Sequence, residues 1–346
     1  MNTNPQNAIP QNALPAREGK WTFGEVWSRF GIIFIFLGIT LVVGIVTKGR
    51  FTTWNNMTTI FRNSSTVGII SLGMTFVIIS GGIDLSSGSV LSTAGTVLIF
   101  MQASGKFPLI ISMLGSIGVG IGFGLANGMI ITKFKMPPFI TTLATGIIAR
   151  SITTYACNGS TITGNKEDII FRNIGTGNIK TDAGIIVMPI PFIMMLVVAV
   201  VLTIVLMKTK FGTYTFSVGC NENAAKYSGI KVDRMKIYTY IIVGACAGLG
   251  AIIEMSRMVS VSSTASGLNY EFDAITAVLL GGTSLSGGRG TIYGTVFGAI
   301  LLFFVSNIMI QLNISTYLTG TVKGLIILGA VLLQMLGRVG QKARLE

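Results

Sequence analysis

Long apolar runs are the feature of this sequence that most restricts its fold. Only 11% of the 346 residues are charged, whereas soluble domains carry about 25% charged residues. A soluble core of this size cannot bury so much apolar chain, so we expect a lipid bilayer around these runs. The sequence predicts an all-α polytopic membrane protein with about ten transmembrane helices. The expected spans are Gly31–Thr47, Val67–Ser80, Gly88–Met101, Pro108–Thr132, Pro138–Tyr155, Pro189–Met207, Ile237–Met255, Phe272–Leu285, Thr291–Ile310 and Tyr317–Leu336.

Two of these spans adjoin nearly the same eight residues. Residues 81–88 read GGIDLSSG and residues 281–288 read GGTSLSGG. Because hydrocarbon tolerates non-helical backbone only inside protein or beside a water-filled cavity, we expect short or broken helices at both motifs. Such paired breaks are typical of transport sites, although tight turns between packed helices would give the same pattern. Asp84 and Ser284 are candidate N-caps of the helices that follow.

Small residues recur at the spacing that brings helices close together. The pairs Gly118/Gly122, Gly120/Gly124 and Gly244/Gly248 are each four residues apart. Glycine at this spacing lets two helix backbones approach each other, so the pattern favours helix packing. We do not interpret it as a phosphate-binding loop.

Several classes of function are disfavoured by what the sequence lacks. It contains no histidine, which is the commonest metal ligand and the usual acid–base group near neutral pH. Cys157, Cys220 and Cys246 lack metal-ligand spacing, so we expect no metal site and no catalytic residue. No P-loop is present, and the chain is not expected to hydrolyse ATP by itself. Its net charge of +13 is spread through the loops, which argues against a nucleic-acid partner.

The distribution of basic residues predicts the orientation of the chain. With the N-terminus inside, about fifteen Lys and Arg residues lie on the cytoplasmic side and about eight outside, which favours two cytoplasmic termini. Residues 1–29 are expected to form a partly disordered cytoplasmic tail, because they begin with a segment rich in Asn, Gln and Pro. Residues 30–337 then form the transmembrane domain, and residues 338–346 a second cytoplasmic tail.

The cytoplasmic loop 208–236 contains a candidate docking element. Residues 219–229, GCNENAAKYSG, are interpreted as one short helix. Asn221 can cap its start, Glu222 suits its first turn, and Gly229 can end it. The alternative is a plain connector, because caps occur on all helices.

Polar residues within or near the spans are candidates for contact with a transported solute. The charged ones are few, and such residues are functional hypotheses in a membrane. The low charge of the spans fits a neutral, hydroxyl-rich solute. The sequence does not decide whether Asp84 gates the pathway, caps a helix or contacts the solute. The candidates for the substrate pathway are Asp84, Ser86, Ser87, Asn127, Glu271, Asp273, Thr283 and Ser284, and the other charges considered are Arg150, Glu254 and Lys323.

Several motifs together resemble the signatures of permease subunits from ribose-type ABC monosaccharide importers. They are GGIDLS at residues 81–86, YEFDAI at residues 270–275, LGGTSLSGGRG at residues 280–290, NENAAKYSGI at residues 221–230, Asn127-Gly128, and PFITTL at residues 138–143. The resemblance covers roughly residues 30–337. It implies a subunit of the bacterial inner membrane, surrounded by lipid, that works as a homodimer or with a related permease.

The resemblance also implies partners and a mechanism. A periplasmic sugar-binding protein would deliver the solute, and a cytoplasmic ATPase would bind ATP-Mg and drive alternating access. The permease itself would bind no cofactor. The rival hypotheses are an ion-coupled secondary transporter of a small neutral solute and a non-transporting membrane scaffold. The resemblance further implies that the short helix in loop 208–236 is a coupling helix, which docks on the ATPase. It would present to the ATPase Asn221, Glu222, Asn223, Ala224, Ala225, Ser228 and Gly229.

Overall fold

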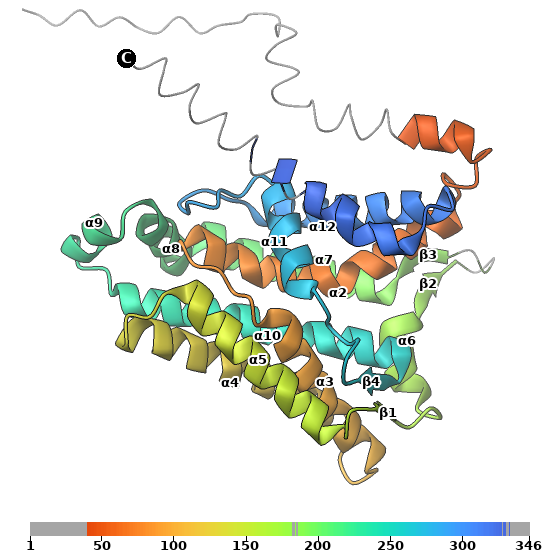
Figure 1. Ribbon diagram of the computed structural model, residues 1–346, viewed down its shortest axis with the longest axis horizontal. Helices are drawn as coiled ribbons and strands as arrows, with labels where there is room; N and C mark the ends of the chain where they lie inside the picture. Colours follow the sequence, from red (N-terminus) through yellow and green to blue (C-terminus); the bar gives the residue numbers. More distant parts are fainter. Residues whose placement is uncertain (1–39, 182–183, 185, 327, 330–331, 333–346) are drawn as a thin grey trace, which may run out of the picture. The chain divides into compact units, whose positions relative to one another are not determined.

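The computed structural model describes residues 40–181, 184, 186–326, 328, 329 and 332 (Figure 1). The predicted tails 1–29 and 338–346 lie outside these residues, as does most of the predicted span Gly31–Thr47. The chain divides into two compact units, Met1–Arg50 and Phe51–Glu346. In the first unit, residues 40–46 are helical, and Thr47 Oγ1 donates to the carbonyl oxygen of Val43 at 2.7 Å.

The second unit is built almost entirely of helices, as the apolar runs predicted. Five of its described helices are long and apolar enough to cross a membrane, and the expected total of about ten stays a prediction. These five are α2 (Trp54–Ile79), α4 (Leu109–Lys133), α7 (Ile190–Lys208), α10 (Val232–Met258) and α12 (Ile292–Gln311). The other helices are α3 (Ser87–Ala103), α5 (Pro138–Ala156), α6 (Ile169–Thr176), α8 (Lys210–Cys220), α9 (Glu222–Tyr227), α11 (Tyr270–Leu280) and the 3₁₀ turn η1 (Thr316–Leu318), and residues 319–326 are also helical.

Two small antiparallel sheets are present, one between distant segments and one between neighbouring segments of the sequence. Strand β1 (Thr161–Thr163) pairs with β4 (Ser260–Ser262), with Ile162 opposite Val261. Strand β2 (Asn178–Lys180) pairs with β3 (Ile186–Pro189). Within the second unit, both sheets and α6 lie at the end opposite to α8 and α9 (Figure 1).

Helix α2 is almost twice as long as its apolar run. The prediction placed a short span at Val67–Ser80, but the helix begins at Trp54 and has 26 residues. Its first half is polar in sequence and partly buried in the fold: Ser64 and Ser65, for example, are buried and donate to the carbonyl oxygen of Phe61. Because these hydroxyls are satisfied by the helix itself, polar residues continue a helix that hydropathy alone would end.

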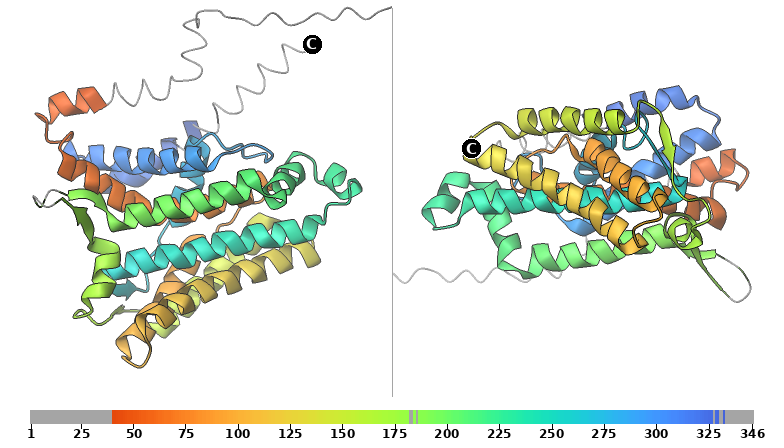
Figure 2. Two further views of the ribbon diagram at one scale, coloured as in Figure 1. Left: turned by 180° about the vertical axis from the view of Figure 1, so that it is seen from behind. Right: turned by 90° about the horizontal axis from the view of Figure 1, so that it is seen from below.

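The helices at the centre of the unit are α2 and α10. In the most apolar 18-residue segment of each helix, 89% of the residues of α2 and 67% of those of α10 are buried. Helix α10 runs beside α4 (Figure 2), where a Cβ atom added to Gly120 would overlap the carbonyl oxygen of Gly244. The packing role predicted for Gly120/Gly124 and Gly244/Gly248 is therefore confirmed. For Gly118/Gly122 it stays a prediction, since a Cβ at either position would meet no described atom of this chain within 4 Å.

Candidate functional site

The first glycine motif breaks the chain between two helices, as predicted. Helix α2 ends at Ile79, and residues 81–86 then run as an irregular segment to the start of α3 (Figure 1). Tyr240 Oη on α10 donates to the carbonyl oxygen of Ile83 at 3.2 Å, and Thr142 Oγ1 on α5 accepts from the N–H of Leu85 at 3.1 Å. Protein groups thereby satisfy backbone atoms that lipid would leave unpaired.

Three of the predicted pathway residues form one buried hydrogen-bond network in this segment. Asp84 is 2% exposed, and its Oδ1 accepts from the N–H of Ser86 at 2.7 Å and from Ser86 Oγ at 2.6 Å. Asn127 Nδ2 on α4 donates to Ser86 Oγ at 2.9 Å. The N-cap residue of α3 is Ser86, so the prediction that Asp84 is the N-cap was wrong. Asp84 instead fixes Ser86 from two residues upstream.

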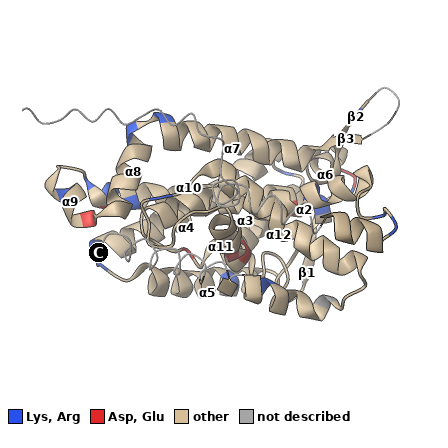
Figure 3. Ribbon diagram, turned by 90° about the horizontal axis from the view of Figure 1, so that it is seen from above, with Lys and Arg blue, Asp and Glu red and all other residues tan. Residues whose placement is uncertain are grey.

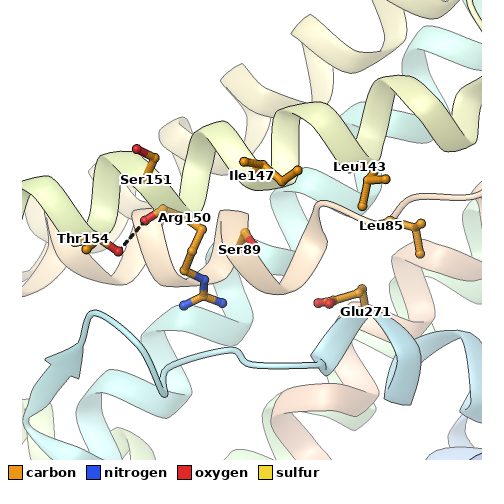
Figure 4. Close-up of a pocket in the computed structure, with 9 residues that line it drawn as sticks. Leu85, Ser89, Leu143, Ile147, Arg150, Ser151, Thr154 and Glu271 are labelled. Carbon is orange, nitrogen blue, oxygen red and sulfur yellow. Dashed lines mark hydrogen bonds between the residues drawn. The ribbon is translucent and has the colours of Figure 1, made fainter. Parts of the chain in front are cut away.

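A cavity of about 450 Å³, lined by apolar surface with a few polar side chains, lies beside this network between α3, α5 and α11 (Figure 4). Glu271, a predicted pathway residue, lies on one side of it, and Arg150 lies on another. Arg150 Nη1 donates to the carbonyl oxygen of Ser266 at 2.7 Å and to Ser92 Oγ at 3.1 Å. The residues that line the cavity are Leu85, Ser89, Leu143, Gly146, Ile147, Arg150, Ser151, Thr154 and Glu271.

Most of this lining was not among the sequence-based candidates. Arg150 was considered as a charge within a span but was not assigned to the pathway. A signal was nevertheless present, because Gly146, Arg150 and Thr154 recur every four residues and therefore share one face of α5. That row is small or polar, although Leu143 and Ile147 flank it, and α5 falls outside the group of five apolar spans.

The remaining candidates do not line the cavity. Ser87 is 2% exposed, and its Oγ has no hydrogen-bond partner among the described residues. Asp273 is 8% exposed and forms an ion pair with Lys323, with 2.7 Å between Oδ2 and Nζ. Thr283 and Ser284 belong to the second glycine motif. The roles of all eight residues in a pathway stay predictions.

The second glycine motif ends its helix with the same cap as the first, one residue later than the alignment of the two motifs placed it. Gly81 and Gly282 both have φ +84°, and each follows the last turn of its helix. In α2 the N–H of Gly82 binds the carbonyl oxygen of Val77, and in α11 the N–H of Thr283 binds that of Val278. Both helices thus end in the same left-handed cap. The structural offset is therefore 201 residues rather than 200.

After this cap the second motif departs from the first. Helix α11 ends at Leu280, five residues before the predicted end of that span. The N-cap of α12 is Thr291, whose Oγ1 accepts from the N–H of Gly294 at 3.2 Å. The prediction that Ser284 is an N-cap was wrong, because residues 281–290 form a loop before the helix begins. Sequence similarity alone did not reveal that the second break is longer.

The loop of the second motif touches the end of α2 and the end of α8. The N–H of Gly288 donates to the carbonyl oxygen of Ile79 at 2.9 Å. A Cβ atom on Gly219, in the last turn of α8, would overlap that same oxygen and would lie against the nitrogen of Gly288. Three backbones therefore meet here, and we call this contact of Ile79, Gly219 and Gly288 the glycine junction.

The predicted cytoplasmic helix is present in shorter form. It is α9, Glu222–Tyr227, and Gly219 and Cys220 belong to α8 instead. Asn221 Oδ1 accepts from the N–H of Ala224 at 3.0 Å, which confirms its capping role. Gly229 ends the helix with φ +80°, also as predicted. Glu222 forms an ion pair with Lys236 on α10, with 2.6 Å between Oε2 and Nζ.

Comparison with known proteins places the chain in a family. A family model described as "Branched-chain amino acid transport system / permease component" matches residues 56–331. The chain belongs to this family of transport permeases. No solved structure matches it.

Curated relatives of the permease confirm the resemblance indicated by its motifs. A ribose import permease protein of Bacillus subtilis is 42% identical over 300 residues, which are 86% of this chain and 91% of the relative. A D-allose transport system permease protein of Escherichia coli is 33% identical over 91% of this chain and 94% of its own length. An L-arabinose transport system permease protein of Escherichia coli is 34% identical over 98% and 99%.

Loss of the Asp84 carboxylate is expected to destabilise the permease. In Asp84→Ala the buried N–H and hydroxyl of Ser86 lose their acceptor, and each unsatisfied buried group costs about 1–3 kcal/mol. We expect a lower thermal unfolding temperature in detergent, measured by fluorescence. Asp233→Ala removes an exposed carboxylate from the first turn of α10, which is worth at most about 1 kcal/mol, and should lower this temperature far less. Equal unfolding temperatures for Asp84→Ala and the unaltered permease would contradict the role given to the network.

Proposed function

We propose that this chain is the membrane-spanning permease subunit of an ATP-driven importer and that it translocates a monosaccharide. The observation that carries the proposal is the match to relatives named for ribose, allose and arabinose transport over at least 86% of this chain. The family model also covers amino acid permeases, but the curated names favour a sugar. An ion-coupled secondary transporter is not favoured by these relatives.

The proposed energy source is a cytoplasmic ATPase that binds ATP-Mg and docks on α9. The helix is capped at both ends and tied to α10 by the ion pair between Glu222 and Lys236. A short helix fixed in this way can transmit a displacement of the ATPase to the membrane helices. The proposed contact residues are Asn221, Glu222, Asn223, Ala224, Ala225, Ser228 and Gly229.

The proposed orientation places α8 and α9 in the cytoplasm. Lys and Arg residues gather at this end of the second unit (Figure 3), and basic loops face the cytoplasm in membrane proteins. Both termini would then be cytoplasmic, with 1–29 and 338–346 as tails of the transmembrane domain 30–337. A periplasmic sugar-binding protein would dock at the opposite end, and a second copy or a related permease would complete the pathway in the bacterial inner membrane.

Reconstitution tests the proposed function. Proteoliposomes would contain the permease with the ATPase and binding protein encoded beside it, and uptake of labelled ribose, allose and arabinose would be measured. We expect uptake of one or more of these sugars only when ATP is supplied to the ATPase and all components are present. Uptake by the permease alone, driven by an ion gradient, would contradict the proposal.

Removal of the N-cap of α9 is expected to impair coupling to the ATPase. Asn221→Ala deletes the acceptor for the N–H of Ala224 and costs about 1 kcal/mol of helix stability, which is a large share for a helix of six residues. We expect sugar uptake to fall about fivefold or more, with a smaller change in ATP hydrolysis. Asn221→Asp retains a capping oxygen and should restore uptake. Normal uptake by Asn221→Ala would argue that α9 is a plain connector.

A further inference from the structure

Two opposite charges face the cavity between α3, α5 and α11 from different helices. Arg150 comes from α5, and Glu271 lies in the first turn of α11 (Figure 4). Among the described residues no ion pair joins them, because the ion pairs found are Lys236–Glu222 and Lys323–Asp273. Charges within a membrane protein are costly unless they are paired or hydrogen-bonded. The separation of this pair therefore points to a polar ligand between them.

The width of the gap is fixed by contacts behind each charge. Nη1 of Arg150 is held by the carbonyl oxygen of Ser266 and the hydroxyl of Ser92, which directs this nitrogen away from Glu271. Glu271 Oε2 lies beside Gly88 in the first turn of α3, where a Cβ atom would overlap it. This oxygen is buried and has no hydrogen-bond partner among the described residues, so the rest of the Glu271 side chain is what borders the cavity. Its charge lies near the N-termini of α3 and α11, whose dipoles stabilise a carboxylate.

The rest of the cavity suits an uncharged polyhydroxyl compound. Hydroxyls of Ser89, Ser151 and Thr154 line it together with the apolar side chains of Leu143 and Ile147. The acidic and basic groups cancel, so the site favours no net charge on its ligand. A volume of about 450 Å³ falls within the range of small-molecule sites, which is about 300–1,000 Å³.

We propose that this cavity is a monosaccharide subsite of the permease, in which Glu271 accepts hydrogen bonds from sugar hydroxyls and Arg150 donates to them. The proposal rests on the proposed function and specifies where the sugar binds within this chain. The apolar side chains would contact the C–H face of the sugar ring. Glu271 was a pathway candidate from the sequence, and the structure adds Arg150 as the group opposite to it.

A zwitterionic amino acid is the rival ligand, because it also carries one charge of each sign. Its carboxylate would require a pair of parallel hydrogen bonds from the guanidinium. Nη1 of Arg150 already donates to the carbonyl of Ser266 and the hydroxyl of Ser92, which leaves no free two-pronged edge that includes this nitrogen. A neutral sugar hydroxyl needs only one hydrogen bond from the guanidinium. The Nε–Nη2 edge stays open, so what favours the sugar is the hydroxyl lining of Ser89, Ser151 and Thr154 rather than Arg150.

Thiol protection tests this subsite on the permease alone. Ser151→Cys, at an exposed position on the cavity wall, is combined with Cys220→Ala, which removes the exposed native cysteine. N-ethylmaleimide labelling is then followed in detergent with ribose, allose, arabinose or leucine. We expect at least one sugar to slow labelling and leucine not to. Protection by leucine alone, or by none of these compounds, would overturn the subsite.

Glu271→Gln is the decisive variant, because glutamine keeps the size of this cavity-lining side chain and removes its charge. Weakening charged hydrogen bonds to the sugar should raise the sugar concentration needed for protection about tenfold or more. Ile148→Ala, on α5 but outside the cavity lining, is the matched control and should leave protection unchanged. Unaltered protection in Glu271→Gln would overturn the proposed role of this carboxylate.

Reconstituted transport separates failure of the subsite from failure of the proposed function. If the unaltered permease imports sugar with ATP and Glu271→Gln imports it about tenfold more slowly, the subsite is supported. If both import sugar equally well, the subsite is wrong and the proposed function stands. If the unaltered permease imports leucine and no sugar, both are wrong.

Discussion

Replacement of Gly219 by alanine is expected to reduce sugar uptake at least about tenfold while the permease stays folded. The added methyl group would overlap the carbonyl oxygen of Ile79 and press on the nitrogen of Gly288. Both atoms belong to the glycine junction, where they share a hydrogen bond of 2.9 Å. Close backbone packing of this kind leaves no room for a side chain. The last turn of α8 must therefore move away from α2 and from the second motif.

The consequence for coupling follows from the position of Gly219 in the chain. It lies two residues before Asn221, the N-cap of α9. Displacement of α8 at this point would move α9 relative to the ends of α2 and α11, so that motion of the ATPase would no longer reach them. We expect sugar uptake to fall at least about tenfold, whereas ATP hydrolysis by the assembled importer persists.

The measurement compares uptake with ATP hydrolysis in the same proteoliposomes. Gly118→Ala is the matched control, since a Cβ there would meet no described atom within 4 Å; it should retain both activities. Full uptake by Gly219→Ala would show that the junction does not transmit the motion. A proportional fall in both activities would instead indicate a loss of assembly rather than of coupling.

Gly244→Val is expected to cause the largest loss of stability. A Cβ atom at Gly244 would overlap the carbonyl oxygen of Gly120, and the reverse overlap holds as well. One turn further along, Ser116 Oγ donates to the carbonyl oxygen of Gly248 at 3.1 Å, which requires the same close approach of α4 and α10. Forcing the helices apart would break this contact and open the core. Overpacking of this kind costs about 3 kcal/mol or more.

Thermal unfolding of the purified permease in detergent measures this effect. Gly122→Val is the control, because the added atoms would point away from α10 into open space, and valine is a better helix former than glycine. It should unfold at the temperature of the unaltered protein or above it. An unfolding temperature for Gly244→Val equal to that of Gly122→Val would refute the close crossing of α4 and α10.

The boundaries of several helices were predictable from local sequence alone. The predicted span Pro108–Thr132 corresponds to the observed helix Leu109–Lys133, and the predicted span Thr291–Ile310 to the observed helix Ile292–Gln311. In these cases an apolar run is bounded by proline, a capping residue or a charge, and such signals act within a few residues. The capped helix α9 was predictable for the same reason.

Local sequence was a poor guide where polar residues are buried. The first half of α2 is too polar to read as a span, but its side chains find partners inside the fold: Asn56 exchanges hydrogen bonds with Asn307 on α12 at 2.9 and 3.0 Å. Hydropathy sums residue by residue and does not register such partners. Residue identity likewise does not register backbone conformation. The two glycine motifs align at an offset of 200 residues, although their helix caps correspond at an offset of 201.

The sequence by itself determined the membrane class, the placement of most helices, the two breaks and the family to which the permease belongs. These features depend on apolar runs, caps and motifs, which are properties of contiguous residues. The tertiary structure alone decided which polar residues meet. Asn127 reaches Ser86 across 41 residues, and Arg150 reaches Ser266 across 116. Contacts at such separations depend on how the helices pack, because packing sets which of many polar side chains face the same cavity.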